Sequence, residues 1–201
     1  MVRVAKVLSI IFHPLLIPTF GFLILFNSGT YLSFLDFEFK RMIFFLVVLS
    51  TLIIPLLLTL FLYYQKLLYS FNLSERRERY IPLIIVLVFY VFCYILLKRA
   101  PVPHHYHAFC FATVITTLLT LAVTLKWKVS FHMIGLGGLT GMIVFLIFSM
   151  RINLEFYLIL AIIATGISGT SRLILDAHKP SQLYAGFILG LVTVPSVMWI
   201  Y

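Results

Sequence analysis

Seven long apolar stretches divide the chain, and they restrict its fold more than any other feature. An α-helix needs about 20 apolar residues to cross the hydrocarbon core of a bilayer, where an isolated strand cannot satisfy its backbone hydrogen bonds. We therefore predict an all-α, polytopic transmembrane helical bundle with six to seven spans, forming one membrane domain over residues 1–201. The stretches run near residues 7–26, 42–64, 81–97, 107–125, 133–150, 154–170 and 183–200.

The first stretch contains Pro14 and Pro18, which makes its form less regular than that of the others. Proline interrupts the hydrogen-bond ladder of a helix, so we expect this segment to be kinked, short or partly re-entrant. Arg3 and Lys6 precede it, as in a signal peptide, but the apolar run is long enough to span and no small-x-small cleavage site follows cleanly. We expect a retained first helix.

Composition excludes a water-soluble protein. Only 10% of the residues are charged, whereas a soluble domain keeps roughly a quarter. The net charge of +9 does not point to nucleic acid, because the basic residues stand in short loops beside the spans. There they mark topology and contact lipid headgroups, or they bind an anionic substrate. We expect membrane lipids as partners and no nucleic acid, and the sequence indicates no oligomeric state. Cys93 and Cys110 lie in apolar runs and are expected to pack rather than pair.

Charge alone leaves the orientation open. With seven spans, the N-terminus shares one side, side A, with the loops near 65–80, 126–132 and 171–182; the opposite side is side B. Side A carries ten Lys and Arg residues and side B five, so the positive-inside rule places side A in the cytoplasm. If the arginines of 76–79, Lys126, Lys128, Arg172 and Lys179 serve a site instead, three remain on side A and the preference reverses.

Small residues predict where helices approach closely. Gly137 and Gly141 are four residues apart, as are Gly186 and Gly190, and 166 and 169 are also glycines. Glycine faces let helix backbones approach one another in lipid. We expect these positions to serve packing rather than chemistry.

Three side-A segments, 74–82, 126–132 and 171–182, hold the residues best able to do chemistry, and together they suit a phosphate ester. Arg172 offers a planar fork for phosphate oxygens. Arg79 or Arg76, with Lys128, adds positive charge that can stabilise a pentacoordinate transition state. Ser130 and the free amides of the helix that follows it can bind an anion.

Two histidines supply the reactive groups. His178 and His132 can divide the roles of nucleophile and general acid. No carboxylate cluster is present to hold a metal, so we expect a mechanism without metal or other cofactor.

The spacing of these residues resembles the type-2 phosphatidic acid phosphatase superfamily, in its integral membrane branch. Ser171-Arg172, five residues and then His178 is similar to the third signature of that family. Ser130-Phe131-His132 resembles the second, Pro-Ser-Gly-His, with Val129 and Phe131 replacing Pro and Gly. The region from 79 to 82 loosely resembles the first, a Lys, six residues and Arg-Pro. The resemblance covers about residues 70–201, which it implies is the phosphatase core.

The resemblance implies a function for each matched residue. His178 attacks phosphorus and forms a phosphohistidine, and His132 protonates the leaving oxygen. Phosphate is bound by Arg172, Ser171, Lys128, Ser130 and the arginines at 76 and 79. Membrane members mostly dephosphorylate lipid phosphates or diphosphates, with the site facing the periplasm of the bacterial inner membrane or a lumen.

Three departures from the family pattern bear on activity. The Asp that usually orients the nucleophilic His is replaced by Gln182, which still accepts the ring N–H; branches similar to dolichyl-diphosphatases and glucose-6-phosphatase share this Gln. Polyprenyl diphosphate is therefore our first candidate substrate. Phe131 replaces a Gly that lets the backbone approach phosphate, and Asn72 stands where the first signature has Lys.

Two other functions stay open. A non-enzymatic member of the fold that binds lipid or a protein partner is consistent with the three departures. A small transporter is supported only by the number of spans, and its ionisable residues would be expected nearer mid-bilayer. The segment 103–107, with histidines at 104, 105 and 107, resembles a metal site, but we expect a polar loop on side B. His13, inside the first span, is expected to be a hydrogen-bonded polar residue.

Overall fold

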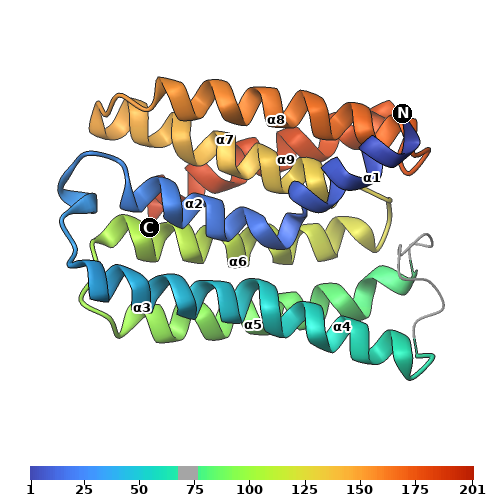
Figure 1. The fold of residues 1–201 in the computed structure, drawn as a ribbon, viewed down its shortest axis with the longest axis horizontal. Coiled ribbons are helices and arrows are strands. Elements are labelled where there is room, and N and C mark those ends of the chain that lie inside the picture. The colour runs from blue at the N-terminus through green and yellow to red at the C-terminus, as the bar shows by residue number, and fades with distance from the viewer. Residues whose placement is uncertain (68–76) are drawn as a thin grey trace.

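The computed structural model describes residues 1–67 and 77–201, and the described residues form helices and connecting turns without strands. Seven segments are long and apolar enough to cross a membrane, which confirms the multi-pass all-α bundle (Figure 1). Two of them are composite, because α1 and α2 form the first span and a π-helical turn, Leu49–Ile53, joins α3 to α4 in the second. The helices are α1 (Val2–Ile11), α2 (Ile17–Phe26), α3 (Phe37–Val48), α4 (Ile54–Tyr64), α5 (Tyr80–Lys98), α6 (His104–Thr124), α7 (Phe131–Met150), α8 (Glu155–Ile174) and α9 (Pro180–Ile200).

The first span is broken at His13, as its prolines predict. α1 ends at Ile11, a single 3-10 turn covers Pro14–Leu16, and α2 follows directly. His13 begins this turn, and its Nδ1 accepts a hydrogen bond from the backbone N–H of Leu15 at 3.3 Å. Pro14 suits the first position of the turn, where no backbone donor is needed. The two halves together still cover 25 residues, enough to cross a bilayer.

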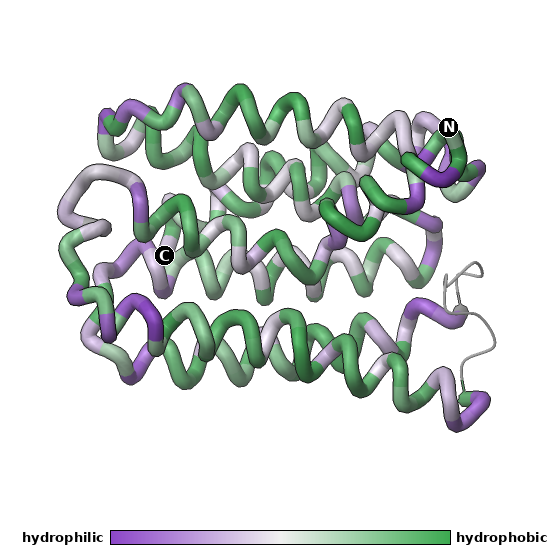
Figure 2. The backbone as a smooth tube through the Cα atoms, viewed as in Figure 1, coloured by the Kyte–Doolittle hydropathy of each residue, from purple (hydrophilic) through white to green (hydrophobic). Residues whose placement is uncertain are grey.

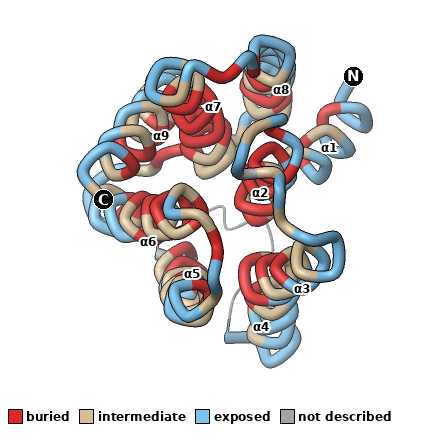
Figure 3. Tube along the Cα trace, turned by 90° about the vertical axis from the view of Figure 1, so that its left-hand side faces the viewer, coloured by how far each residue is buried: buried red, intermediate tan, exposed pale blue. Residues whose placement is uncertain are grey.

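The helices run along one long axis, so the polar residues gather at the two ends of the bundle. The N-terminus lies at the side-A end with the ends of α4 and α8, and the C-terminus lies at the other end (Figure 1). Apolar residues fill the middle of the helices, while hydrophilic residues mark their ends (Figure 2). Buried residues of α2, α6 and α7 face the interior, and exposed residues face outward (Figure 3). The outward residues include Leu57, Val88 and Ile162, which suit contact with lipid.

Glycine allows α7 and α9 to touch backbone to backbone. A Cβ on Gly190 would lie 2.0 Å from the carbonyl oxygen of Ile134, and one on Gly137 would lie 2.2 Å from that of Phe187. The close packing expected at these glycines is therefore present. Gly166 differs, since a Cβ there would meet no atom within 4 Å, and the packing function expected of it is absent. The α7–α9 contact fixes how the first turns of the two helices face each other.

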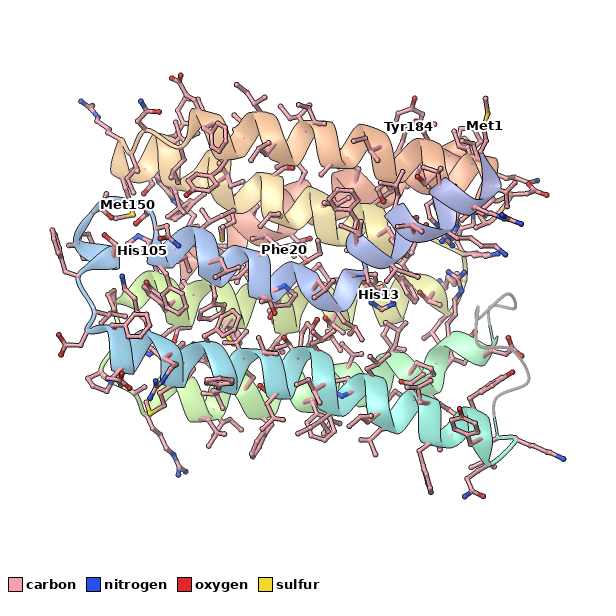
Figure 4. All side chains as sticks on the ribbon, in the orientation of Figure 1. Met1, His13, Phe20, His105, Met150 and Tyr184 are labelled. Atoms are coloured by element: carbon pink, nitrogen blue, oxygen red, sulfur yellow. The ribbon has the colours of Figure 1, made fainter. Side chains whose placement is uncertain are left out.

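Residues 104–107 of the histidine-rich segment form the first turn of α6, so the prediction of a loop there is wrong. Pro103 is the N-cap of α6, which begins at His104. Proline suits the start of a helix, because no backbone donor is needed there. His105 Nδ1 lies 3.1 Å from the hydroxyl of Tyr31, and His107 Nε2 lies 3.0 Å from the carbonyl oxygen of Leu97. These two rings therefore turn to different partners instead of a shared ion. Figure 4 shows His105 at the end of the bundle opposite Met1, away from the side-A residues.

Candidate active site

The last turn of α8 and the first turn of α9 place His178 in the site. The backbone N–H of Asp176 bonds the carbonyl of Leu173 at 2.9 Å, and that of Ala177 bonds the carbonyl of Arg172 at 3.1 Å. This pair of bonds ends the helix in a Schellman motif, whose left-handed residue is Asp176 with φ of 49°. Aspartate tolerates this conformation better than most residues. The turn reverses the chain within four residues, so that His178 lies beside the helix end that carries Arg172.

Gln182 fixes the tautomer of His178. Its Oε1 accepts the backbone N–H of Lys179 at 3.1 Å, and since a backbone amide only donates, this atom is the side-chain oxygen. The same Oε1 lies 3.1 Å from Nδ1 of His178. Nδ1 must therefore carry the ring proton and donate it, which leaves a lone pair on Nε2. Gln182 is therefore the residue that hydrogen-bonds Nδ1 of His178.

Burial and positive charge keep His178 neutral. The side chain is buried, and this burial is the main reason why its pKa falls to about 4. The charges of Arg79, Arg172 and Lys128, named here the cationic cluster, lower the pKa of His178 further. The hydrogen bond to Gln182 acts in the opposite direction. His178 is thus an unprotonated base at neutral pH, surrounded by groups that attract an anion.

Two polar atoms in the site lack the partner that their chemistry requires. Nε of Arg172 and Oγ of Ser130 are both buried, and neither has a hydrogen-bond partner among the residues that the structure describes. Ser130 is the N-cap of α7, yet its hydroxyl makes no capping bond. A buried donor without an acceptor costs about 1–3 kcal/mol. A bound anion with several oxygens would satisfy both atoms.

Arg79 reaches the site from the turn before α5. It is 5% exposed, and its Nη1 donates to the carbonyl oxygen of Val129 at 3.0 Å, directly before Ser130. Its guanidinium carbon lies 5.0 Å from the ring centre of Phe131, a cation–π contact. Burial, and then the charge of Arg172, lower the pKa of Arg79 to about 10, so it stays protonated at neutral pH. Phe131, which stands where the family resembled by the sequence has Gly, thus packs against Arg79.

Lys128 completes the cationic cluster from the loop between α6 and α7. Its side chain is partly buried, and this desolvation is the first cause that lowers its pKa. Repulsion by Arg79 and Arg172 lowers the pKa of Lys128 further, while Asp176 raises it. Three cations therefore lie within electrostatic reach of one another. Holding them together favours an anionic ligand, which would relieve their repulsion.

The first span also contributes to the site, which the sequence did not predict. Nε2 of His132 lies 3.0 Å from the backbone oxygen of Ser9, so it donates its proton there and Nδ1 is left to exchange protons. The hydroxyl of Ser9 accepts a hydrogen bond from Nη1 of Arg172 at 3.3 Å. The rings of His13 and His132 meet edge to face, 5.8 Å between centres. Figure 4 shows His13 at the break of this span.

The remaining expected residues have different outcomes. The hydroxyl of Ser171 donates to the carbonyl of Ile167 at 2.8 Å, within its own helix, so its proton is not available to phosphate. Arg76 and Asn72 lie outside the described residues. Within the described ranges, no group of three His, Cys, Asp or Glu side chains is placed to hold a metal ion.

The comparisons with known proteins add no relative. No family model, curated protein or solved structure matches the chain. Any function inferred for the site must therefore be argued from the positions of its own residues.

Proposed function

We propose that the protein is a membrane phosphatase that hydrolyses a lipid phosphate or diphosphate, and that it belongs to the integral membrane branch of the type-2 phosphatidic acid phosphatase superfamily. The observation that carries this proposal is the free Nε2 lone pair of His178 beside Arg172, whose buried Nε–H has no acceptor within the described part of the chain. A nucleophile and an unused phosphate donor side by side suit phosphoryl transfer.

The reaction proceeds in two steps. Nε2 of His178 attacks phosphorus while the bond to the leaving oxygen breaks. His132, which begins the step protonated on both ring nitrogens, gives that oxygen the proton from Nδ1 and becomes neutral. A water molecule then attacks the phosphohistidine, with His132 taking its proton, and inorganic phosphate leaves as His178 regains its lone pair. The cationic cluster stabilises the charge on the equatorial oxygens, and neither step requires an oxidant or reductant.

Polyprenyl diphosphate is the first candidate substrate, because Gln182 resembles the residue of diphosphatase branches. Phosphatidate, phosphatidylglycerol phosphate and lipid A phosphate are the other candidates. We place the site at the periplasmic face of a bacterial inner membrane. With seven spans the C-terminus then lies in the cytoplasm, so a fluorescent protein fused after Tyr201 should be fluorescent and a fused alkaline phosphatase inactive.

The test of the phosphatase is phosphate release from a panel of lipid phosphates by purified protein. His178→Ala should abolish both phosphate release and the acid-labile phosphohistidine intermediate. His105→Ala changes a histidine at the opposite end of the bundle, and this variant should still release phosphate and form the intermediate. Equal release by wild type and His178→Ala would refute the mechanism.

A non-enzymatic lipid-binding protein is the second candidate. The contact between Arg79 and Phe131 favours this function, because the phenyl ring covers one face of the guanidinium that the phosphatase would use on phosphate. Phosphate binding without release from any substrate would support this function instead.

A further inference from the structure

An apolar cavity lies within the bundle, and its wall includes Phe131, the residue that contacts Arg79 of the cationic cluster. Its volume is about 120 Å³, and it is partly open to the outside. The first span, α5, α6, α7 and α9 all contribute to its wall, which includes Pro14, Val86, Thr117, Phe131, Leu139 and Val194. From Phe131 to Leu139 the wall follows α7 for about 12 Å, at the usual rise per residue.

The cavity is apolar although four threonines of α6 line it. The hydroxyls of Thr113 and Thr116 donate to the backbone oxygens of Cys110 and Ala112, both at 2.7 Å. Those of the other two threonines, 117 and 120, donate to the oxygens of Thr113 and Thr116 at 2.8 and 2.7 Å. Every hydroxyl proton is therefore used inside the helix. A cavity lined in this way favours an apolar guest over water.

One residue joins the cavity to the cationic cluster. Phe131 lines the cavity, and its ring also lies 5.0 Å from the guanidinium carbon of Arg79. On the facing wall, Pro14 follows His13, whose ring contacts that of His132. A molecule that fills both spaces must carry an anionic group at one end and a hydrocarbon chain at the other.

We infer that this cavity binds the hydrocarbon chain of a single-chain lipid phosphate whose phosphate lies in the cationic cluster. The inference depends on the proposed function only for the nature of the headgroup, and not on hydrolysis. A single chain fits because the five surrounding segments leave one continuous space, so a two-chain lipid would have to leave a chain in the bilayer.

Alkylphosphonates test the inference without hydrolysis, because their phosphorus–carbon bond is not cleaved by this chemistry. We would measure the affinities of butylphosphonate and dodecylphosphonate for purified protein in one detergent. Thr117→Phe fills the cavity, and Leu118→Phe introduces the same side chain at the next position, where the leucine is 48% exposed. Because the phenyl ring would occupy space that the chain needs, Thr117→Phe should weaken the binding of dodecylphosphonate about tenfold relative to butylphosphonate, and Leu118→Phe should not.

A second cavity variant keeps the test possible if Thr117→Phe does not fold. Val86→Phe fills the cavity from α5 and should cause the same selective loss. Unchanged dodecyl-to-butyl selectivity in a folded cavity variant would overturn the inference. Chain-selective binding without release of phosphate from any lipid phosphate would support the chain site and refute the phosphatase. Release of phosphate without chain-selective binding would support the phosphatase and refute the chain site.

Discussion

Gln182→Glu tests how charge around His178, the proposed nucleophile, controls its pKa. The change replaces an amide nitrogen by oxygen and keeps Oε1, which accepts from His178 and from the N–H of Lys179, both at 3.1 Å. A carboxylate this close stabilises the imidazolium and raises a histidine pKa by about 1–3 units. The pKa of His178 should then rise from about 4 toward its usual range.

The assay is kcat/KM for a lipid phosphate as a function of pH. His178 attacks only when neutral, so the rate falls as pH decreases through its pKa. The acidic limb of the wild type should lie near pH 4, following the pKa of about 4, and that of Gln182→Glu at least about one unit higher. Gln182→Met removes Oε1, the acceptor for His178, and should lower the rate about tenfold, the upper range for one lost hydrogen bond. An acidic limb at the same pH in wild type and Gln182→Glu would refute the assigned tautomer and nucleophile.

Three further substitutions test other contacts. Arg172→Lys removes the planar donor fork and should reduce kcat/KM by roughly 10–150-fold, as expected for a hydrogen bond to a charged group; a smaller loss than for Lys128→Ala would contradict its place at the phosphate. Ser9→Ala loses one hydrogen bond to Arg172 and should raise KM about fivefold without changing kcat; an unchanged KM would show that this contact does not position the arginine. Gly190→Ala should lower the melting temperature strongly, because its Cβ would lie 2.0 Å from a backbone oxygen, while Gly166→Ala, with open space, should not; equal melting temperatures would contradict the close packing of α7 and α9.

The sequence predicted the spans well because lipid imposes one requirement on every residue of a spanning helix. Runs of apolar residues long enough to cross a bilayer can form little else there. The break at His13 was also predictable, since Pro14 has a local and strong effect. The start of α6 at His104 was not, because polar histidines in a first helical turn look the same in sequence as histidines in a loop.

The site was predictable only where its contacts are short-range in sequence. His178 and Gln182 are four residues apart on one turn, so their hydrogen bond follows from local geometry. Ser9 lies 163 residues from Arg172, and only the packed structure brings them together. Ser171 shows that closeness in sequence can also mislead. Its position beside Arg172 suggested a phosphate ligand, but its hydroxyl donates to the carbonyl oxygen of Ile167 in its own helix.

The contact between Ser9 and the residues of α7 and α8 has a consequence for biosynthesis. A membrane protein is inserted from its N-terminus, so the helix that carries Ser9 enters the bilayer before His132 and Arg172 have been made. Ser9 can meet His132 only after the fifth span has been made, and it can meet Arg172, 163 residues later in the sequence, only after the sixth. The side-A residues contacted by Ser9 therefore come together only after the first six spans have been made.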